Sequence, residues 1–298
     1  MIANFYIIPE SLSNESLNNE KFLTSLQSFV SDYHNFLEFK EENKIIIQRD
    51  VFDVVLPNGK TLAEFLYSHD SEIQGKELSL KQFLSSIFLK LSNQDVDIEI
   101  IKEKIKCNSI ENCFGIISLH KIEGLADENQ VIYDKDSWYG FRRFHLGLYF
   151  NDEKYFIDEC KKYYPKLYFH DNNYDSISKI LNSFSKKIIF HLNGLNDVLP
   201  SLLEKKDFKN HTDLLIMFST EASLDENASL EGSNKNRLKF DFYNKNGETE
   251  SLVCEPHIKL CFNDSLDGQY YFNRIYFSFG KENIENFKIL VAHIGEHL

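Results

Sequence analysis

The chain has 298 residues, a formal net charge of −13 at neutral pH, 42% hydrophobic residues and 27% charged residues, a composition typical of a globular protein of one or two domains. The acidic charge argues against general binding to nucleic acid or to anionic membranes, which proteins achieve with clustered Lys and Arg. Because no apolar run is long enough to span a bilayer, the start is not signal-like and the five cysteines are scattered, we expect a cytoplasmic protein without disulfides and without membrane contact.

The N-terminal part of the chain alternates between strand-like and helix-like patterns. Residues 4–10 are an apolar run that stops at Pro9, which predicts a short buried strand. Aromatic and leucine residues then recur at helical spacing between residues 11 and 39, so this segment is predicted to be a helix that faces the core. Further helices are predicted over 61–70, 78–92 and 95–106, and strands over 44–56 and 114–122.

The segment 123–150 carries a dense mixture of acidic, basic and aromatic residues. Phe141, Phe144 and Leu148 have helical spacing, and Arg142 and Arg143 fall on the other face of that helix. We expect this face to be solvated, and its two guanidinium groups are candidates for binding the phosphates of an RNA substrate.

Residues 151–224 are predicted to be mainly helical. Asn151 or Asp152 can cap a helix that ends before Pro165 and leads into a strand. Two more helical regions follow, one within 176–206 that is expected to end near Pro200, and one over 213–224.

The residues from 225 to 237 lack periodicity and are rich in Asn, Ser, Gly and charge, which is typical of a linker. We therefore predict a mixed α/β N-terminal region over 1–228, which would bind a substrate, a protein partner or an inhibitor. A second region over 236–298 would carry the candidate site.

This second region is predicted to be a four-stranded antiparallel sheet, which makes the whole chain an α+β protein. The pair Asn246-Gly247 predicts a hairpin turn ahead of the strand 250–262. The strands 272–279 and 287–298 follow, and both are rich in β-branched and aromatic residues.

Alternation along these strands places ionisable side chains on one face. In 253–262 acidic and basic side chains alternate with apolar ones, and the same split recurs in the next two strands. If the strands are neighbours, one surface carries a group of acid, base and anion-binding side chains: Glu255, His257, Lys259, Arg274, Tyr276 and His293, with His297 four residues after His293.

One interpretation of this surface is a metal-dependent nuclease. Restriction-type folds place an Asp, then a Glu and a Lys one residue apart, on adjacent strands. Here Asp241, Glu255 and Lys259 form a degenerate version, because His257 stands where the Glu would be.

A second metal-based interpretation uses His293 and His297, which are four residues apart like zinc-binding histidines on a helix. Gly295 and the β-rich run before it do not favour a helix. We expect neither a metal nor another cofactor.

The third interpretation is metal-free cleavage of RNA. This reaction needs a base for the 2′-hydroxyl proton, a cation for the charge that develops on the phosphate, and an acid for the leaving oxygen. Every role has a candidate: Glu255 or His257 as base, Arg274 and Lys259 as the anion clamp, Tyr276 as a substrate contact, and His293 or His297 as acid.

The arginine in RIYF, followed by an apolar strand that ends in histidine in ILVAHIGEHL, resembles the closing hairpin of the RelE-type bacterial mRNA-interferase toxins. The resemblance covers the C-terminal fifth of the chain. It implies RNA cleavage by Glu, Arg, His, Lys and Tyr side chains on a small antiparallel sheet, with Arg274 and His293 as the best matches and Glu255 as the acid or base.

The sequence therefore predicts a nuclease-like cytoplasmic effector that cleaves RNA without a metal, and the resemblance implies a toxin or phage-defence setting. The alternative is a non-enzymatic subunit whose acidic N-terminal helices bind a protein partner. In that case the polar residues of the sheet would form cross-strand ion pairs without any chemistry.

Overall fold

The computed structural model describes residues 3–12, 18–38, 43–68, 75–94, 97–106, 113–122, 128–232, 235–260 and 272–298. The chain folds into two compact units, residues 1–145 and 146–298, and the predicted α+β class is confirmed. The division at residue 145 differs from the predicted boundary between 228 and 236. The reason is that one apolar core joins the helices after residue 146 to the C-terminal strands.

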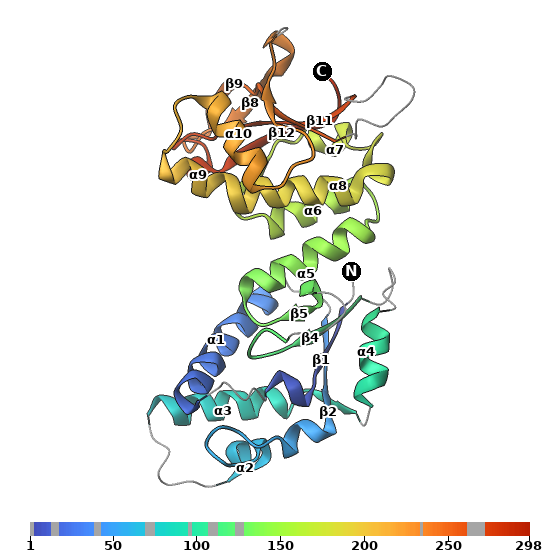
Figure 1. The fold of residues 1–298 in the computed structure, drawn as a ribbon, viewed down its shortest axis with the longest axis vertical. Coiled ribbons are helices and arrows are strands. Elements are labelled where there is room, and N and C mark those ends of the chain that lie inside the picture. The colour runs from blue at the N-terminus through green and yellow to red at the C-terminus, as the bar shows by residue number, and fades with distance from the viewer. Residues whose placement is uncertain are drawn as a thin grey trace. The chain divides into compact units, whose positions relative to one another are not determined.

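The first unit is built on a parallel sheet with the strand order β3-β2-β1-β4-β5 (Figure 1). Its central strands are short apolar runs buried on both faces, as is usual when helices cover both sides of a parallel sheet. The strands are β1 (Ala3–Ile7), β2 (Asn43–Gln48), β3 (Ser92–Gln94), β4 (Cys113–Ile117) and β5 (Val131–Ile132).

Helices cover both faces of this sheet. They are α1 (Asn19–Glu38), α2 (Leu62–Tyr67), α3 (Lys76–Phe88), α4 (Ile98–Lys106) and α5 (Lys135–Leu148), with short 3-10 turns η1 (Pro9–Ser11), η2 (Arg49–Asp53) and η3 (Glu128–Gln130). Ile101 and Ile105 of α4 pack against Tyr6 of β1 and Ile116 of β4. Helices α1 and α3 cover the opposite face (Figure 1).

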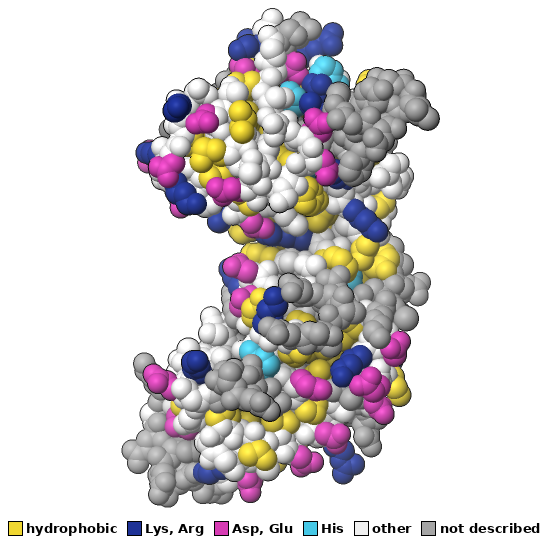
Figure 2. Space-filling view, in the orientation of Figure 1, with side chains coloured by type: hydrophobic (Ala, Val, Ile, Leu, Met, Phe, Trp, Pro, Cys, Tyr) yellow, Lys and Arg dark blue, Asp and Glu magenta, His cyan; other side chains and the backbone are white. Residues whose placement is uncertain are grey.

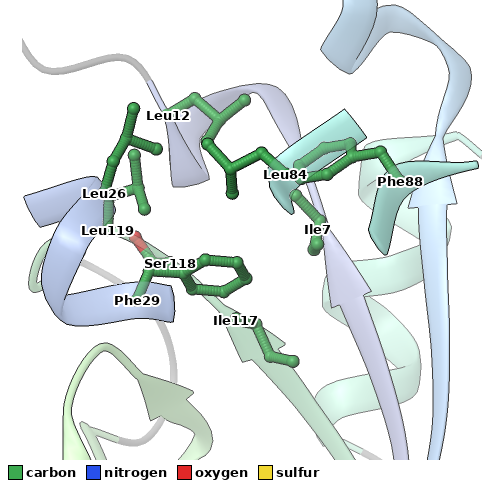
Figure 3. A pocket seen from close by; sticks show the side chains of 9 residues that line it. All are labelled: Ile7, Leu12, Leu26, Phe29, Leu84, Phe88, Ile117, Ser118 and Leu119. Carbon is green, nitrogen blue, oxygen red and sulfur yellow. The ribbon is translucent and has the colours of Figure 1, made fainter. Parts of the chain in front are cut away.

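A small apolar cavity of about 10 Å³ remains between α1, α3 and the sheet (Figure 3). Figure 3 shows aliphatic and phenyl side chains such as Phe29, Leu84 and Ile117 turned toward it. The one hydroxyl in its lining, that of Ser118, donates to the carbonyl of Ser11 at 3.1 Å. The cavity holds at most about one water and offers no unused polar group, so it is a packing defect rather than a ligand site.

The second unit begins with helices that form its core. They are α6 (Glu153–Tyr163), α7 (Asn173–Ser176), α8 (Leu181–Asn193), α9 (Leu199–Lys205) and α10 (His211–Glu221), with a π-helical turn η4 (Gly194–Val198) between α8 and α9. Asp152 caps α6 as predicted, since its carboxylate accepts the Tyr155 N–H at 2.7 Å. Within the described residues, no helix has the length and apolarity that crossing a membrane requires.

The C-terminal sheet has five strands in the order β6-β12-β11-β10-β7, not the four that were predicted. The predicted strand 250–262 is divided at Cys254-Glu255, and its halves belong to different sheets because Pro256 starts a new strand. The strands are β6 (Leu167–Phe169), β7 (Ser229–Leu230), β10 (Pro256–Lys259), β11 (Asn273–Ser278) and β12 (Ile289–Glu296), while β8 (Lys239–Tyr243) and β9 (Thr249–Val253) pair as a separate hairpin; η5 (Lys235–Leu238) and η6 (Glu285–Phe287) are 3-10 turns.

The two faces of this sheet have different coverings (Figure 1). The helices pack on one face, where Ile258, Ile275 and Ile294 of three neighbouring strands meet in the core. On the other face, the hairpin β8–β9 packs on Leu290 and Ala292, in the first half of β12. The polar side chains lie on this same face, on the second half of β12 and on the strands beside it.

A β-bulge in β12 places His293 on the polar face. The register shifts between Tyr276 and Phe277 of β11, so that Tyr276 pairs with His293 and Phe277 pairs with Val291. Strict alternation had put His293 on the same side as Val291, but Val291 lies in the core. The extra residue re-aims the following side chains, as bulges do.

Candidate functional site

Polar side chains cross four neighbouring strands in register. Ser229 of β7 lies beside His257, His257 lies beside Tyr276, and Tyr276 lies beside His293. Lys259 and Arg274 form the next pair along the same face. The sheet therefore brings together five of the residues that alternation predicted to share a surface: His257, Lys259, Arg274, Tyr276 and His293.

Glu231, just beyond β7, is the centre of this face. Its Oε2 atom accepts hydrogen bonds from Arg274 Nη1 at 2.8 Å and from the Tyr276 hydroxyl at 3.4 Å. His297 Nε2 lies 3.3 Å from the same oxygen. We call this group the sheet-face cluster; it comprises Ser229, Glu231, His257, Arg274, Tyr276, His293 and His297.

The cluster is partly accessible to solvent. The Arg274 and Glu231 side chains are 13% and 19% exposed and that of His297 is 39% exposed, whereas Tyr276 is fully buried. Figure 2 shows histidine side chains at the surface of the second unit, beside basic and acidic ones. A ligand can therefore reach the side of the cluster formed by Glu231, Arg274 and His297.

Arg274 has hydrogen-bonding capacity beyond its two contacts with Glu231 and Tyr276. Its Nη1 atom donates to the Glu231 carboxylate and, at 3.2 Å, to the Tyr276 hydroxyl. Its buried Nε has no hydrogen-bond partner among the described residues. A guanidinium with an unused N–H is suited to bind an oxyanion such as a phosphate.

His257 is held as a neutral imidazole. Its Nδ1–H donates to the Glu255 carbonyl at 3.3 Å, which leaves Nε2 to accept from the Ser229 hydroxyl at 3.1 Å. Burial, followed by the nearby Arg274 charge, lowers the pKa of His257 to about 4. The ring therefore carries no charge at neutral pH, and it supports Tyr276, whose ring centre lies 5.3 Å away.

His293 is also buried, and both of its ring nitrogens are engaged. Nε2 lies 2.8 Å from the Glu296 carbonyl, and Nδ1 lies 3.1 Å from the side-chain amide of Asn172. Burial lowers the pKa of His293. An imidazole fixed in this way positions β12 and Tyr276 but is poorly placed to give a proton to a substrate. Of the two predicted acids, His297 is therefore the better candidate.

Electrostatics favour an ionised Glu231 at neutral pH. Burial opposes its ionisation, but the hydrogen bond with His297 and the charges of neighbouring groups, Arg274 among them, keep the pKa of Glu231 below its ordinary value. The same environment acts in the opposite direction on Tyr276, because burial raises the pKa of its phenol. The cluster thus contains a carboxylate and a neutral phenol in contact with one guanidinium.

Glu255 is not part of the cluster. Its carboxylate pairs with Lys235 at 2.7 Å, and only its backbone carbonyl serves the site, by accepting from Glu231 N at 3.1 Å and from His257. The break in the strand at Cys254-Glu255 explains this, because the alternation that placed Glu255 beside His257 does not continue across it. Lys259 stays on the polar face but lies 3.7 Å from Glu226.

The two arginines of α5 do not occupy an exposed helix face. Arg142 and Arg143 are 2% and 6% exposed, and their guanidinium groups lie over the rings of Trp138 and Tyr139. The prediction of a solvated face is therefore wrong. Aromatic neighbours one helical turn away cover the guanidinium groups, which leaves them little surface for a phosphate.

The described residues lack the geometry that the two metal-based interpretations require. Asp241 lies on β8, in a different sheet from Lys259, and its carboxylate accepts from the Ser251 hydroxyl. His293 lies on a strand, not on the helix that a zinc pair four residues apart would require. Among the described residues, no three His, Cys, Asp or Glu side chains are grouped as metal ligands would be.

Ser229 and Glu231 are the site residues that sequence reasoning missed, because both fall in the segment predicted to be a linker. The alternation of apolar and polar residues in Ala228, Ser229, Leu230 and Glu231 was the available signal. It is short, because β7 pairs with β10 through only two residues.

Comparison of the chain with protein-family models, with curated proteins and with solved structures gave no match. The site therefore has to be interpreted from its own geometry.

Proposed function

We propose that the sheet-face cluster is a metal-independent acid–base site that cleaves RNA. The observation that carries this proposal is the contact of one carboxylate with a guanidinium, a phenol and an imidazole at a single oxygen of Glu231. These are the group types that RNA cleavage without a metal requires. Arg274 and Tyr276 lie on β11, while Glu231 and His297 directly follow β7 and β12 of the same sheet.

In the proposed reaction Arg274 binds the scissile phosphate and stabilises the negative charge that develops on it. Glu231 takes the proton of the 2′-hydroxyl at Oε1, which accepts no hydrogen bond from the described residues. The 2′-oxygen then attacks phosphorus while His297 gives a proton to the departing 5′-oxygen. The products are a 2′,3′-cyclic phosphate and a 5′-hydroxyl, so no water, metal or oxidant is consumed.

The other members of the cluster would hold these groups in place. Tyr276 donates to Glu231 and stacks near His297, with ring centres 6.5 Å apart. The backbone N–H of His297 donates to the carbonyl of Phe272, which ties the C-terminal residues to the start of β11. Lys259, on the same face, adds positive charge beside the phosphate-binding arginine.

The test is cleavage of an end-labelled RNA by the full-length protein in EDTA. We expect Arg274→Ala to lower kcat/KM by about 100-fold or more, and His297→Ala and Glu231→Gln by similar factors. Arg237→Ala removes an exposed arginine outside the cluster and should cleave like the wild type. An RNA with a 2′-deoxy nucleotide at the cleavage position should remain intact.

Equal cleavage by the wild type and all three cluster variants, or no cleavage by any of them, would remove the assignment. Activity that appears only when magnesium is added would favour a metal-dependent nuclease instead. The resemblance to RelE-type toxins extends the proposal to a cytoplasmic toxin or antiviral-defence effector. If the protein is such a toxin, expression of the wild type should arrest cell growth and expression of Arg274→Ala should not.

A second candidate function is a non-enzymatic subunit of a protein complex. The burial of Tyr276, His257 and His293, and the pairing of Glu255 with Lys235, are the observations that favour it. In this case the polar face supports the sheet, and the acidic chain binds a basic protein partner or inhibitor. Intact RNA after incubation, with unchanged partner binding by Arg274→Ala and His297→Ala, would support the subunit.

A further inference from the structure

The second unit contains a large pocket at the opposite end of the β11–β12 hairpin from the sheet-face cluster. Phe279 and Gly280, which leave β11, and residues 285–288, which lead into β12, form one wall, while α9 and the segments beside it form the rest. Its volume is about 950 Å³, at the upper end of the range of roughly 300–1,000 Å³ that is usual for small-molecule sites. Phe279, the first pocket residue after β11, is five residues from Arg274, which corresponds to about 17 Å along an extended strand.

The lining combines aromatic rings with lysines. Phe208, Phe279 and Phe287 supply three phenyl rings, and Leu203 adds to the apolar surface. Lys166, Lys206 and Lys288 also line the pocket. Flat apolar surface next to ammonium groups suits a ligand with a planar ring at one end and negative charge at the other.

Two of the three lysines that line the pocket have no ion-pair partner among the described residues. Lys288 lies 3.1 Å from Glu285, but Lys166 and Lys206 make no ion pair with any described residue. Glu204 is the other acidic residue of the lining. A pocket with more lysines than acids is notable in a chain with a net charge of −13, and it favours an anionic ligand over a cationic one.

The backbone beside the pocket is held in an unfavourable conformation. Glu285, Asn286 and Phe287 have consecutive φ values of 49°, 54° and 63°, in the left-handed region that residues with side chains seldom adopt. Phe287, at the end of this turn, is nevertheless 62% exposed, so core packing does not account for its position. Strain of this kind concentrates at binding sites. Here it presents a phenyl ring and the Asn286 amide at the wall of the pocket.

We propose that this pocket binds a nucleotide, with its base stacked on the phenyl rings and its phosphates at Lys166 and Lys206. Every base offers a face for stacking on an aromatic ring, and the Asn286 amide can both donate to and accept from a base edge. This assignment is independent of RNA cleavage at the sheet-face cluster, because the two sites share no residue.

The experiment is calorimetric titration of the full-length protein with ATP, and with adenosine and tripolyphosphate as its two halves. ATP should bind more tightly than either half. Phe287→Ala should weaken both ATP and adenosine by about fivefold or more, since it removes a stacking surface. Lys206→Ala should weaken ATP and tripolyphosphate and leave adenosine unchanged.

Lys205→Ala is the matched control, because Lys205 is an exposed neighbour of Lys206 outside the pocket lining. It should bind all three compounds like the wild type. Phe287 and Lys206 are exposed, so their variants should keep the wild-type melting temperature, which separates a binding defect from misfolding. Absence of ATP binding at millimolar concentration, unchanged binding in Phe287→Ala and Lys206→Ala, or equal affinity for ATP and tripolyphosphate would each overturn the proposal.

Discussion

Glu231→Gln removes the charge at the centre of the sheet-face cluster while it keeps the shape of the side chain. Breaking a fully buried ion pair by removing one partner costs about 3–5 kcal/mol, whereas an exposed pair is worth at most about 1 kcal/mol. Arg274 and Glu231 are 13% and 19% exposed, and the amide oxygen of the variant can still accept from Arg274. We therefore expect a loss of about 2 kcal/mol, between these limits.

The assay is hydrogen exchange of the β11 and β12 amides in the full-length protein, followed by mass spectrometry. Fluorescence would not report on this site, because the single tryptophan, Trp138, belongs to the first unit. Asp171→Asn is the control. It removes the partner of Lys161 in a pair whose side chains are 84% and 38% exposed, and it should change protection by less than about 0.5 kcal/mol.

The effect of Glu231→Gln should also depend on pH. The pKa of Glu231 is lowered in the folded state from an ordinary value of 4.5, so its contribution to stability is complete above that pH and is lost as the pH falls through the folded pKa. The difference between wild type and variant should therefore shrink in acid. Equal protection of both proteins at pH 7, or an equally large loss in Asp171→Asn, would refute the reasoning.

Three further substitutions test the second unit. Burial and, after it, the Lys187 charge lower the pKa of His191 to about 3, and neither ring nitrogen has a hydrogen-bond partner among the described residues. At pH 5 only the unfolded wild type takes up a proton at this ring, which favours unfolding. His191→Leu should therefore stabilise the protein by about 2 kcal/mol at pH 5, measured by urea unfolding. Gly280→Ala should cost about 2–4 kcal/mol, since at φ 82° its Cβ would lie 2.2 Å from the Lys288 carbonyl oxygen, whereas Gly247→Ala, at φ 77° with open space around it, should cost only about 1 kcal/mol in the same assay. Asp152→Ala should lower stability by about 1 kcal/mol through loss of the α6 cap, and Asp152→Asn should restore most of it; no difference between the two would contradict the capping assignment.

Local patterns in the sequence were sufficient for most of the secondary structure. Asp152 caps α6, the Asn246-Gly247 pair lies in the turn between β8 and β9, and Ile258 and Ile275 face the core as their spacing required. These features depend on neighbours in the chain. Hydrophobic periodicity and turn chemistry therefore determine them.

The candidate site could be predicted only in part, because its decisive contacts are not local. Alternation placed His257, Arg274 and Tyr276 on one face, but Glu231 reaches that face through a strand of two residues that leaves almost no pattern. Alternation also placed Glu255 on this face, wrongly, because the break between β9 and β10 is not visible from alternation alone. Trp138 and Arg142 are four residues apart, so helical spacing allowed their contact, but it did not show that the guanidinium group would be buried.

The arrangement of the site depends on the backbone of β12 as well as on side-chain chemistry. If β12 kept all its residues but paired with β11 without a bulge, His293 would face the helices and Ile294 would face solvent. Such a strand would keep every ionisable group of the cluster and lose their arrangement. Deleting Ala292, in contrast, would place His293 directly after Val291, so a regular strand would keep both residues on their present faces and the shorter protein should retain the cluster.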